Sequence, residues 1–218
     1  MEIHAPHHPT LTFKEALVHL CIVTAGILIA LSLEGTLEWW HHRELVQETR
    51  ERLEAEIRGN QESIQTVLKS LDPAKSRFIH AIDVARDLSA PGKREEAASI
   101  FSPGILNLSS GMSWAFFKTA AHTTAQVTGA FGLMEYGDAF KYADAYDLQA
   151  LYARMQDGIE RDVVSAVMLG SSIPGKPTPS EIDDTKRQLR LALGGIIILE
   201  EIAKRLNELY STALKEAP

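Results

Sequence analysis

The sequence has little cysteine and no surplus of basic charge, and each of these two scarcities bears on the class of protein. The single cysteine, Cys21, cannot form a disulfide within the chain, so no disulfide framework holds the fold. A net charge of −7 argues against the clustered basic surface that nucleic-acid binding requires. Hydrophobic residues make up 45% and charged residues 23% of the chain, which indicates a globular rather than a disordered protein.

One long apolar run is present, from Ala16 to Leu33, and His19 is its only ionisable residue. As a helix it would extend about 27 Å, close to the hydrocarbon thickness of a bilayer. Tryptophans prefer the headgroup region, and a tryptophan pair follows the run. The sequence therefore predicts a transmembrane helix over 12–40, preceded by a flexible tail over 1–11. Its predicted interface residues are Phe13, Lys14, Trp39 and Trp40.

A cleaved signal peptide and a buried helix of a soluble protein are the alternatives to an anchor. A signal peptide would need a basic start and a small-x-small cleavage site. The chain instead begins MEIHAPHHPT, and its helical periodicity continues past the apolar run. A buried helix would not normally carry a tryptophan pair at one border and a charged continuation beyond it. A retained membrane anchor is favoured.

Two features of the predicted anchor suggest contacts with another chain. Gly26 and Ala30 lie one turn apart and would let two helix backbones approach closely, although a small residue facing lipid gives the same pattern. Glu34 lies at the predicted hydrocarbon edge, where an unpaired carboxylate is costly. We expect Glu34 to be protonated, or paired with a basic group of another chain or of a lipid headgroup.

A helix over 41–71 follows the anchor and carries a narrow apolar seam at heptad spacing. A polar residue on such a seam can fix the register of a paired helix, and Asn60 has this position. Packing of the seam against other helices of the same chain explains the pattern equally well. The two rows of the seam are Val46, Leu53, Asn60 and Val67, and Arg50, Ile57, Ile64 and Leu71.

The remainder of the chain is predicted to be helical. Asp72 before Pro73 is typical of a helix end and a new start. Further helices are expected over 74–89, 112–134, 138–169 and 180–214, with a short helical piece over 94–101, a loop over 170–179, and Ser180 and Asp183 capping the last helix. The apolar stretch 191–199 is too short to span a membrane and is expected in the middle of a bundle. The predicted fold is all-α: one N-terminal transmembrane helix continuing into an elongated helical bundle over 41–218.

No pattern of residues points to catalysis, to a cofactor or to a metal. The stretch 170–176 begins like a phosphate-binding loop, but Pro177 stands where Ser or Thr must hold magnesium. His4, His7 and His8 lie on the tail, and His41 and His42 are consecutive, so neither group has the spacing of a zinc site. The chain is predicted not to be an enzyme.

Two functional classes stay open. The first is a structural or accessory protein that associates with itself or with subunits of a membrane complex. The second is a ligand-binding sensor module that acts through a partner. Its sequence basis is the polar stripe formed by Lys118, His122 and Gln126, which recur every four residues and could line a small pocket.

The stretch GILIALSLEGTLEWWHHR and the segment Thr124 to Tyr152 resemble a group of uncharacterised bacterial single-pass membrane proteins. The second segment shares a TGA step and the spacing of Tyr142, Tyr146 and Gln149. The resemblance implies a bacterial cytoplasmic membrane location and a periplasmic domain. The basic residues that follow the span outnumber Lys14 before it, which favours the opposite orientation. The side of the membrane is left open.

Overall fold

The computed structural model describes residues 13–88, 92, 107–171 and 178–215. Within these ranges the chain forms four α-helices and one short 3-10 helix, and it forms no strand. The predicted all-α fold is confirmed. The predicted tail over 1–11, the predicted helical piece over 94–101 and most of the predicted loop over 170–179 lie outside the described residues.

The first helix, α1 (Phe13–Asp87), is 75 residues long and contributes to two compact units. The units divide between Glu48 and Thr49, eight residues later than the predicted boundary at 40/41. The reason lies in the burial pattern, because residues 41–44 are exposed and the first buried side chain of α1 is that of Thr49. The apolar run and the helix after it are one helix, as the continuing periodicity predicted.

The first part of α1 is the one helix among the described residues that is long and apolar enough to cross a membrane. An 18-residue window in it has a mean hydropathy of 2.4, and none of that window is buried. Ile22, Leu28 and Leu33 are each about 60% exposed, at 64%, 59% and 65%. Because the chain itself does not cover this apolar surface, only lipid or another chain can remove it from water.

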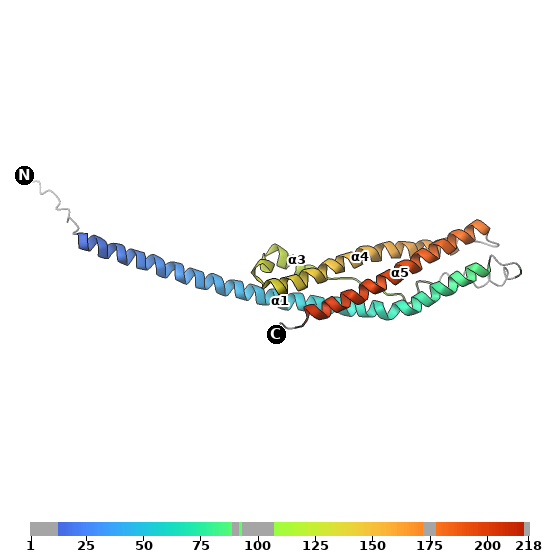
Figure 1. Cartoon of the computed structure of the whole chain (residues 1–218), viewed down its shortest axis with the longest axis horizontal. Coiled ribbons are helices and arrows are strands. Elements are labelled where there is room, and N and C mark those ends of the chain that lie inside the picture. Colours follow the sequence, from blue (N-terminus) through green and yellow to red (C-terminus); the bar gives the residue numbers. More distant parts are fainter. Residues whose placement is uncertain (1–12, 89–91, 93–106, 172–177, 216–218) are drawn as a thin grey trace, which may run out of the picture. The chain divides into compact units, whose positions relative to one another are not determined.

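The second compact unit is a bundle in which α1 from Thr49 onward packs with α4 (Tyr136–Ser171) and α5 (Pro179–Ala213) (Figure 1). These bounds agree with the predicted helices over 138–169 and 180–214 to within two residues. Buried apolar side chains recur every three or four residues on each helix, as a helix that faces a core requires. The largest fully buried side chains include Tyr152, Tyr210, Phe78, Leu53 and Ile57.

Pro73 does not end α1, so the predicted helix end at Asp72 is wrong. A proline inside a helix removes one backbone hydrogen bond and costs about 3 kcal/mol. Here Leu71 and Ala74 on either side of the proline are fully buried, as is Phe78 one turn later. Burial of this face offsets the local cost, and the second half of α1 bends (Figure 1), as helices do at proline.

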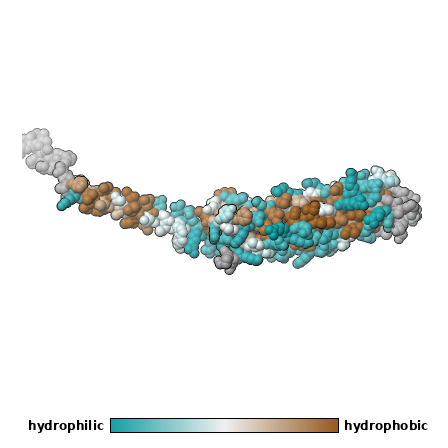
Figure 2. Space-filling view, viewed as in Figure 1, coloured by the Kyte–Doolittle hydropathy of each residue, from teal (hydrophilic) through white to brown (hydrophobic). Residues whose placement is uncertain are grey.

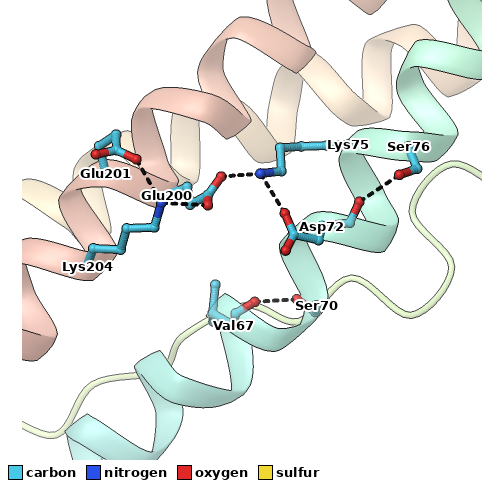
Figure 3. A network of polar contacts seen from close by, with 8 residues as sticks. All are labelled: Val67, Ser70, Asp72, Lys75, Ser76, Glu200, Glu201 and Lys204. Carbon is cyan, nitrogen blue, oxygen red and sulfur yellow. Dashed lines mark hydrogen bonds and ion pairs between the residues drawn. The ribbon is translucent and has the colours of Figure 1, made fainter.

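A network of ion pairs joins α1 to α5 just after Pro73 (Figure 3). The ammonium of Lys75 pairs with Glu200 of α5 and, at 2.7 Å, with Asp72 of its own helix. Glu200 also accepts from Lys204 at 2.8 Å, and Lys204 is 2.9 Å from Glu201. Hydrogen bonds from Lys204, which has the larger effect, and from Lys75 hold the pKa of Glu200 below its usual value. The network therefore ties the bent part of α1 to its neighbour.

The predicted helix over 112–134 is wrong in its first part. Residues 112–119 have no regular secondary structure, α3 covers only Ala120–Val127, and a 3-10 helix follows at Ala130–Leu133. Gly129 ends α3 in the left-handed region with φ of 74°, which favours glycine. Backbone amides of the segment 112–119 bond instead to side chains of Ser70, Gln156 and Asn60.

The last helix begins with a capping box two residues before the predicted pair. Thr178 is the N-cap: its hydroxyl accepts from the Glu181 amide at 3.3 Å, and its own amide donates to the Glu181 carboxylate at 2.7 Å. Ser180 and Asp183 are therefore not the caps. Pro179 holds the first helical position, where its missing N–H leaves no intrahelical bond unmade.

The apolar stretch 191–199 is only half buried, in contrast to the prediction. Ala192, Ile196 and Leu199 are fully buried, whereas Leu191 and Ile198 are 54% and 53% exposed. Figure 2 shows apolar surface over the middle of the bundle. The buried face of this stretch packs closely on α4, since a Cβ on Gly195 would lie 2.7 Å from Cγ1 of Ile159.

Candidate functional site

Apart from Val46, the residues predicted for membrane and assembly contacts in the first compact unit are exposed. No atom lies within 4 Å of the place a Cβ would take on Gly26, and Ala30 and Glu34 are exposed on the same helix. The predicted interface residues Phe13, Lys14, Trp39 and Trp40 are exposed too. Their side chains are open to lipid or to a second protein, as an anchor requires.

The seam after the anchor belongs mostly to this chain's own core. Leu53 and Val67 are 0% exposed and Asn60 is 1% exposed, all within the second compact unit. Val46, which precedes Thr49, and Arg50 of the second row are partly exposed. Of the two alternatives for the seam, packing against the chain's own elements is therefore correct for these three residues, and they are not open to a partner helix.

Asn60 joins α1 to two other parts of the bundle. Its side-chain amide donates to the Lys118 carbonyl at 2.8 Å and to Oε1 of Gln149 on α4 at 3.0 Å. Its carbonyl oxygen accepts from the Lys118 amide at 2.8 Å. The same Gln149 oxygen accepts from the hydroxyl of Tyr210 on α5. Because unpaired polar groups in a core are costly, these bonds fix how α1, α4 and α5 meet.

Glu56, one helical turn before Asn60, caps α3 from another helix. Its carboxylate accepts from the backbone amides of Ala121 at 2.9 Å and His122 at 3.4 Å, which are two of the N-terminal amides that have no partner inside α3. The hydroxyl of Tyr146 donates to the same carboxylate at 2.7 Å. A carboxylate at a helix N-terminus is also favoured by the helix dipole.

Burial, and to a lesser degree the Glu56 carboxylate, raise the pKa of Tyr146 well above its usual value. Burial does the same for Tyr210. Both hydroxyls therefore stay protonated at neutral pH and donate hydrogen bonds. The group of Glu56, Asn60, Tyr146, Gln149 and Tyr210, here called the polar cluster, is satisfied by its own members and by the backbone, and this arrangement suits a structural role.

The non-helical segment 112–119 is held by side chains in place of secondary structure. The amide group of Gln156 accepts from the Ala115 N–H at 2.8 Å and donates to the Ala115 carbonyl at 3.0 Å. The side-chain amide of Asn60 likewise bonds to both the N–H and the carbonyl of Lys118. The Ser70 hydroxyl accepts from the Ser113 amide at 3.0 Å. Each of these backbone groups thus has the partner that a buried backbone needs.

The three residues of the predicted polar stripe do not line one pocket. Lys118 precedes the start of α3, and its side chain and that of Gln126 are exposed. His122 is partly buried and its ring stacks on Tyr146 at 4.1 Å between centroids. Burial lowers the pKa of His122, against a smaller opposite effect of Glu56. These residues give no support to the ligand-binding alternative.

Sequence reasoning missed Glu56, Ser70 and Gln156. A signal for Glu56 was present, because it lies three residues after Leu53 and four before Asn60, on a face that is otherwise apolar. The described residues contain no group of three His, Cys, Asp or Glu side chains close enough to hold a metal ion. The tail histidines His4, His7 and His8 lie outside the described part of the chain.

Comparisons with known protein families, with curated proteins and with solved structures found no match to this chain. The resemblance to uncharacterised single-pass membrane proteins therefore stays a prediction. The residues that carried it, Tyr142, Tyr146 and Gln149, are 3%, 4% and 3% exposed and lie on the inner face of α4. Two of them belong to the polar cluster, so the shared spacing has a structural reason in this chain.

Proposed function

We propose that this protein is a single-pass accessory or scaffold protein of the bacterial cytoplasmic membrane. Its anchor associates with a second copy or with subunits of a membrane complex, and it has no catalysis of its own. One observation carries the proposal: no residue of the apolar window of α1 is buried in the single chain, whereas from Thr49 onward one face of the same helix is buried in the bundle. Such a helix needs a bilayer, and the bundle is anchored there because α1 belongs to both.

The contact face on the anchor is proposed to centre on Gly26 and Ala30. The space around Gly26 is open, and small residues one turn apart allow the close backbone approach that favours helix association in lipid. Glu34, exposed on the same helix, is proposed to bind a basic group of the neighbouring chain or a lipid headgroup. The seam residues Leu53, Asn60 and Val67 have no part in this contact, because they are buried.

Paired glycine substitutions test the association face. Gly26→Leu blocks close approach, while Gly35→Leu makes the same change nine residues on, about 180° around the helix, at a position that is equally open. We expect Gly26→Leu to weaken dimer formation in membranes about tenfold, as loss of about 1.4 kcal/mol of helix packing would. Chemical crosslinking of membrane vesicles at several protein densities measures it.

Gly35→Leu should leave the crosslinked fraction unchanged. If both variants crosslink like the natural chain, the Gly26 face is not the contact. A protein that runs as a monomer in mild detergent and co-purifies with no other subunit contradicts the whole proposal. For the side of the membrane we propose a periplasmic bundle, which the resemblance favours. Alkaline phosphatase and fluorescent-protein fusions after Pro218 report it directly.

A further inference from the structure

A polar pocket of about 330 Å³ lies where three helices of the bundle come together. It is bounded by the start of the bundle part of α1, by the first turns of α4 and by the end of α5. Its volume falls at the lower end of the range of small-molecule sites, which begins at about 300 Å³. The residues that line it are Arg50, Glu54, Asp138, Lys141, Tyr142, Ala213 and Lys215.

Cations outnumber carboxylates on the wall, and both carboxylates are already paired. Asp138 accepts from Arg50 on one oxygen and from Lys141, at 3.1 Å, on the other. Glu54 pairs with Arg58, at 2.8 Å, on the adjoining turn of α1. Arg50, Lys141 and Lys215 therefore give the wall three cations against two carboxylates.

The cations also have donors to spare. A guanidinium has five N–H donors, and the ion pair with Asp138 uses one nitrogen of Arg50. Lys215 is exposed, and no ion pair to it is found among the described residues. Because the wall carries excess positive charge, the pocket favours an anion over a metal ion or an apolar ligand.

Tyr142 supplies a neutral donor. Tyr142 lines the pocket and is 3% exposed, and no hydrogen bond from its hydroxyl to the described part of the chain is found. Burial, helped by the nearby Glu54 carboxylate, raises the pKa of Tyr142 to about 12. The hydroxyl is therefore protonated at neutral pH and can donate to a bound anion.

We propose that this pocket binds a phosphate group, with Arg50, Lys141 and Lys215 around it and the Tyr142 hydroxyl as an additional donor. A tetrahedral anion can accept from donors that approach from α1, from α4 and from the residues after α5, and arginine and lysine are the usual partners of phosphate. The remaining volume holds a small organic group. The phosphate is that of a soluble phosphate ester or of a phospholipid headgroup.

Binding to the full-length protein distinguishes these sources. Isothermal titration of protein in a zwitterionic detergent with inorganic phosphate and with glycerol 3-phosphate tests the soluble source. Native mass spectrometry after exposure to phosphatidylglycerol or to phosphatidylcholine tests the lipid source. Saturable binding of either soluble probe, or retention of phosphatidylglycerol over phosphatidylcholine, is expected. If neither the soluble probes nor phosphatidylglycerol bind, the proposal is wrong.

Variants then locate the site. Lys215→Ala removes an exposed charge and Tyr142→Phe removes only the hydroxyl, so the fold should persist in both, as circular dichroism would show. Each should weaken binding of whichever probe binds by about three- to tenfold, the effect of one lost hydrogen bond to a charged group. Lys69→Ala, which removes an exposed lysine of α1 outside the pocket, is the control. Equal losses in Lys69→Ala and Lys215→Ala would show non-specific attraction and overturn the assignment.

Discussion

The two parts of α1 have the same secondary structure and opposite surroundings. Up to Glu48 every large apolar side chain is at least partly exposed, with Leu28 at 59%. From Thr49 the seam is buried, with Leu53 and Ile64 at 0%. One helix therefore depends on two different environments: the bundle supplies its own apolar surroundings, and the apolar run requires lipid or another chain to supply them.

The comparison also shows where polar residues are placed. In the bundle part, Glu56 and Asn60 are buried and fully bonded to other elements. In the apolar part, Ser32 and Thr36 donate to carbonyls of their own helix at 2.7 and 2.8 Å. Thr66 of the bundle part makes the same local bond at 2.9 Å, so the two parts differ in their buried polar side chains, which among the described residues of α1 begin at Thr49. Such local bonding satisfies a hydroxyl where no water is present. Four pairs of variants test the comparison.

The largest effect is expected from truncating one leucine in each part. Leu53→Ala removes a fully buried side chain and should lower the free energy of unfolding of the bundle by about 2–5 kcal/mol. Leu28→Ala removes a side chain that touches no core and should leave the bundle unchanged. Denaturant unfolding of the full-length protein in detergent, followed by circular dichroism, gives both values. Equal losses would remove the distinction between the two parts.

The next effect concerns the polar cluster. Asn60→Ala leaves the Lys118 amide and carbonyl without their buried partner and should cost about 3 kcal/mol of bundle stability. Gln65→Ala, an exposed amide on the same helix, should change stability by less than about 0.5 kcal/mol. The same unfolding measurement applies. A neutral Asn60→Ala would mean that the segment 112–119 is not held by this side chain.

A smaller effect is expected at Gly195, where the backbone of α5 lies against Ile159 of α4. Gly195→Ala places a methyl group 2.7 Å from Cγ1 of Ile159 and should destabilise the bundle by about 1–3 kcal/mol. Gly194→Ala meets no atom within 4 Å and should stabilise it by up to about 1 kcal/mol through helix propensity. The melting temperatures of the two variants should therefore shift in opposite directions, and shifts of the same sign would contradict the packing.

The smallest effect is the pH response of the ion-pair network. The pKa of Glu200 is lowered in the folded state, so its stabilisation is present above its usual pKa of 4.5 and is lost as the pH falls through the lowered value. Glu200→Gln should lower stability at pH 7 by less than about 1 kcal/mol, and the difference should disappear as the pH falls through the lowered pKa of Glu200. Acid titration followed by circular dichroism measures it. Glu201→Gln, at an exposed position, should show no such trend.

Much of the fold could be predicted from the sequence, because periodicity is a local signal. The helices α4 and α5 and the continuity of α1 past Trp40 were predicted on that basis. The errors arose where contacts distant in sequence decide the outcome. Burial of Leu71 and Ala74 carries α1 through Pro73, and side chains of Asn60 and Gln156 hold the segment 112–119, which was predicted to be helical.

The sites differ in the same way. The exposed positions Gly26, Trp39 and Trp40 could be recognised because a membrane imposes a pattern on consecutive residues. The pocket of Arg50, Asp138 and Lys215 could not, because its walls come from three helices whose meeting point no sequence pattern shows.

The central claim is that the first part of α1 lies in a membrane, and the only cysteine of the chain tests it without any substitution. Cys21 is in the apolar run and is exposed in the single chain. In intact membranes we predict that a water-soluble maleimide does not label Cys21, because the reagent does not enter hydrocarbon, and that labelling becomes complete once the membrane is dissolved in denaturing detergent. Labelling in intact membranes at the rate seen after solubilisation would contradict the account.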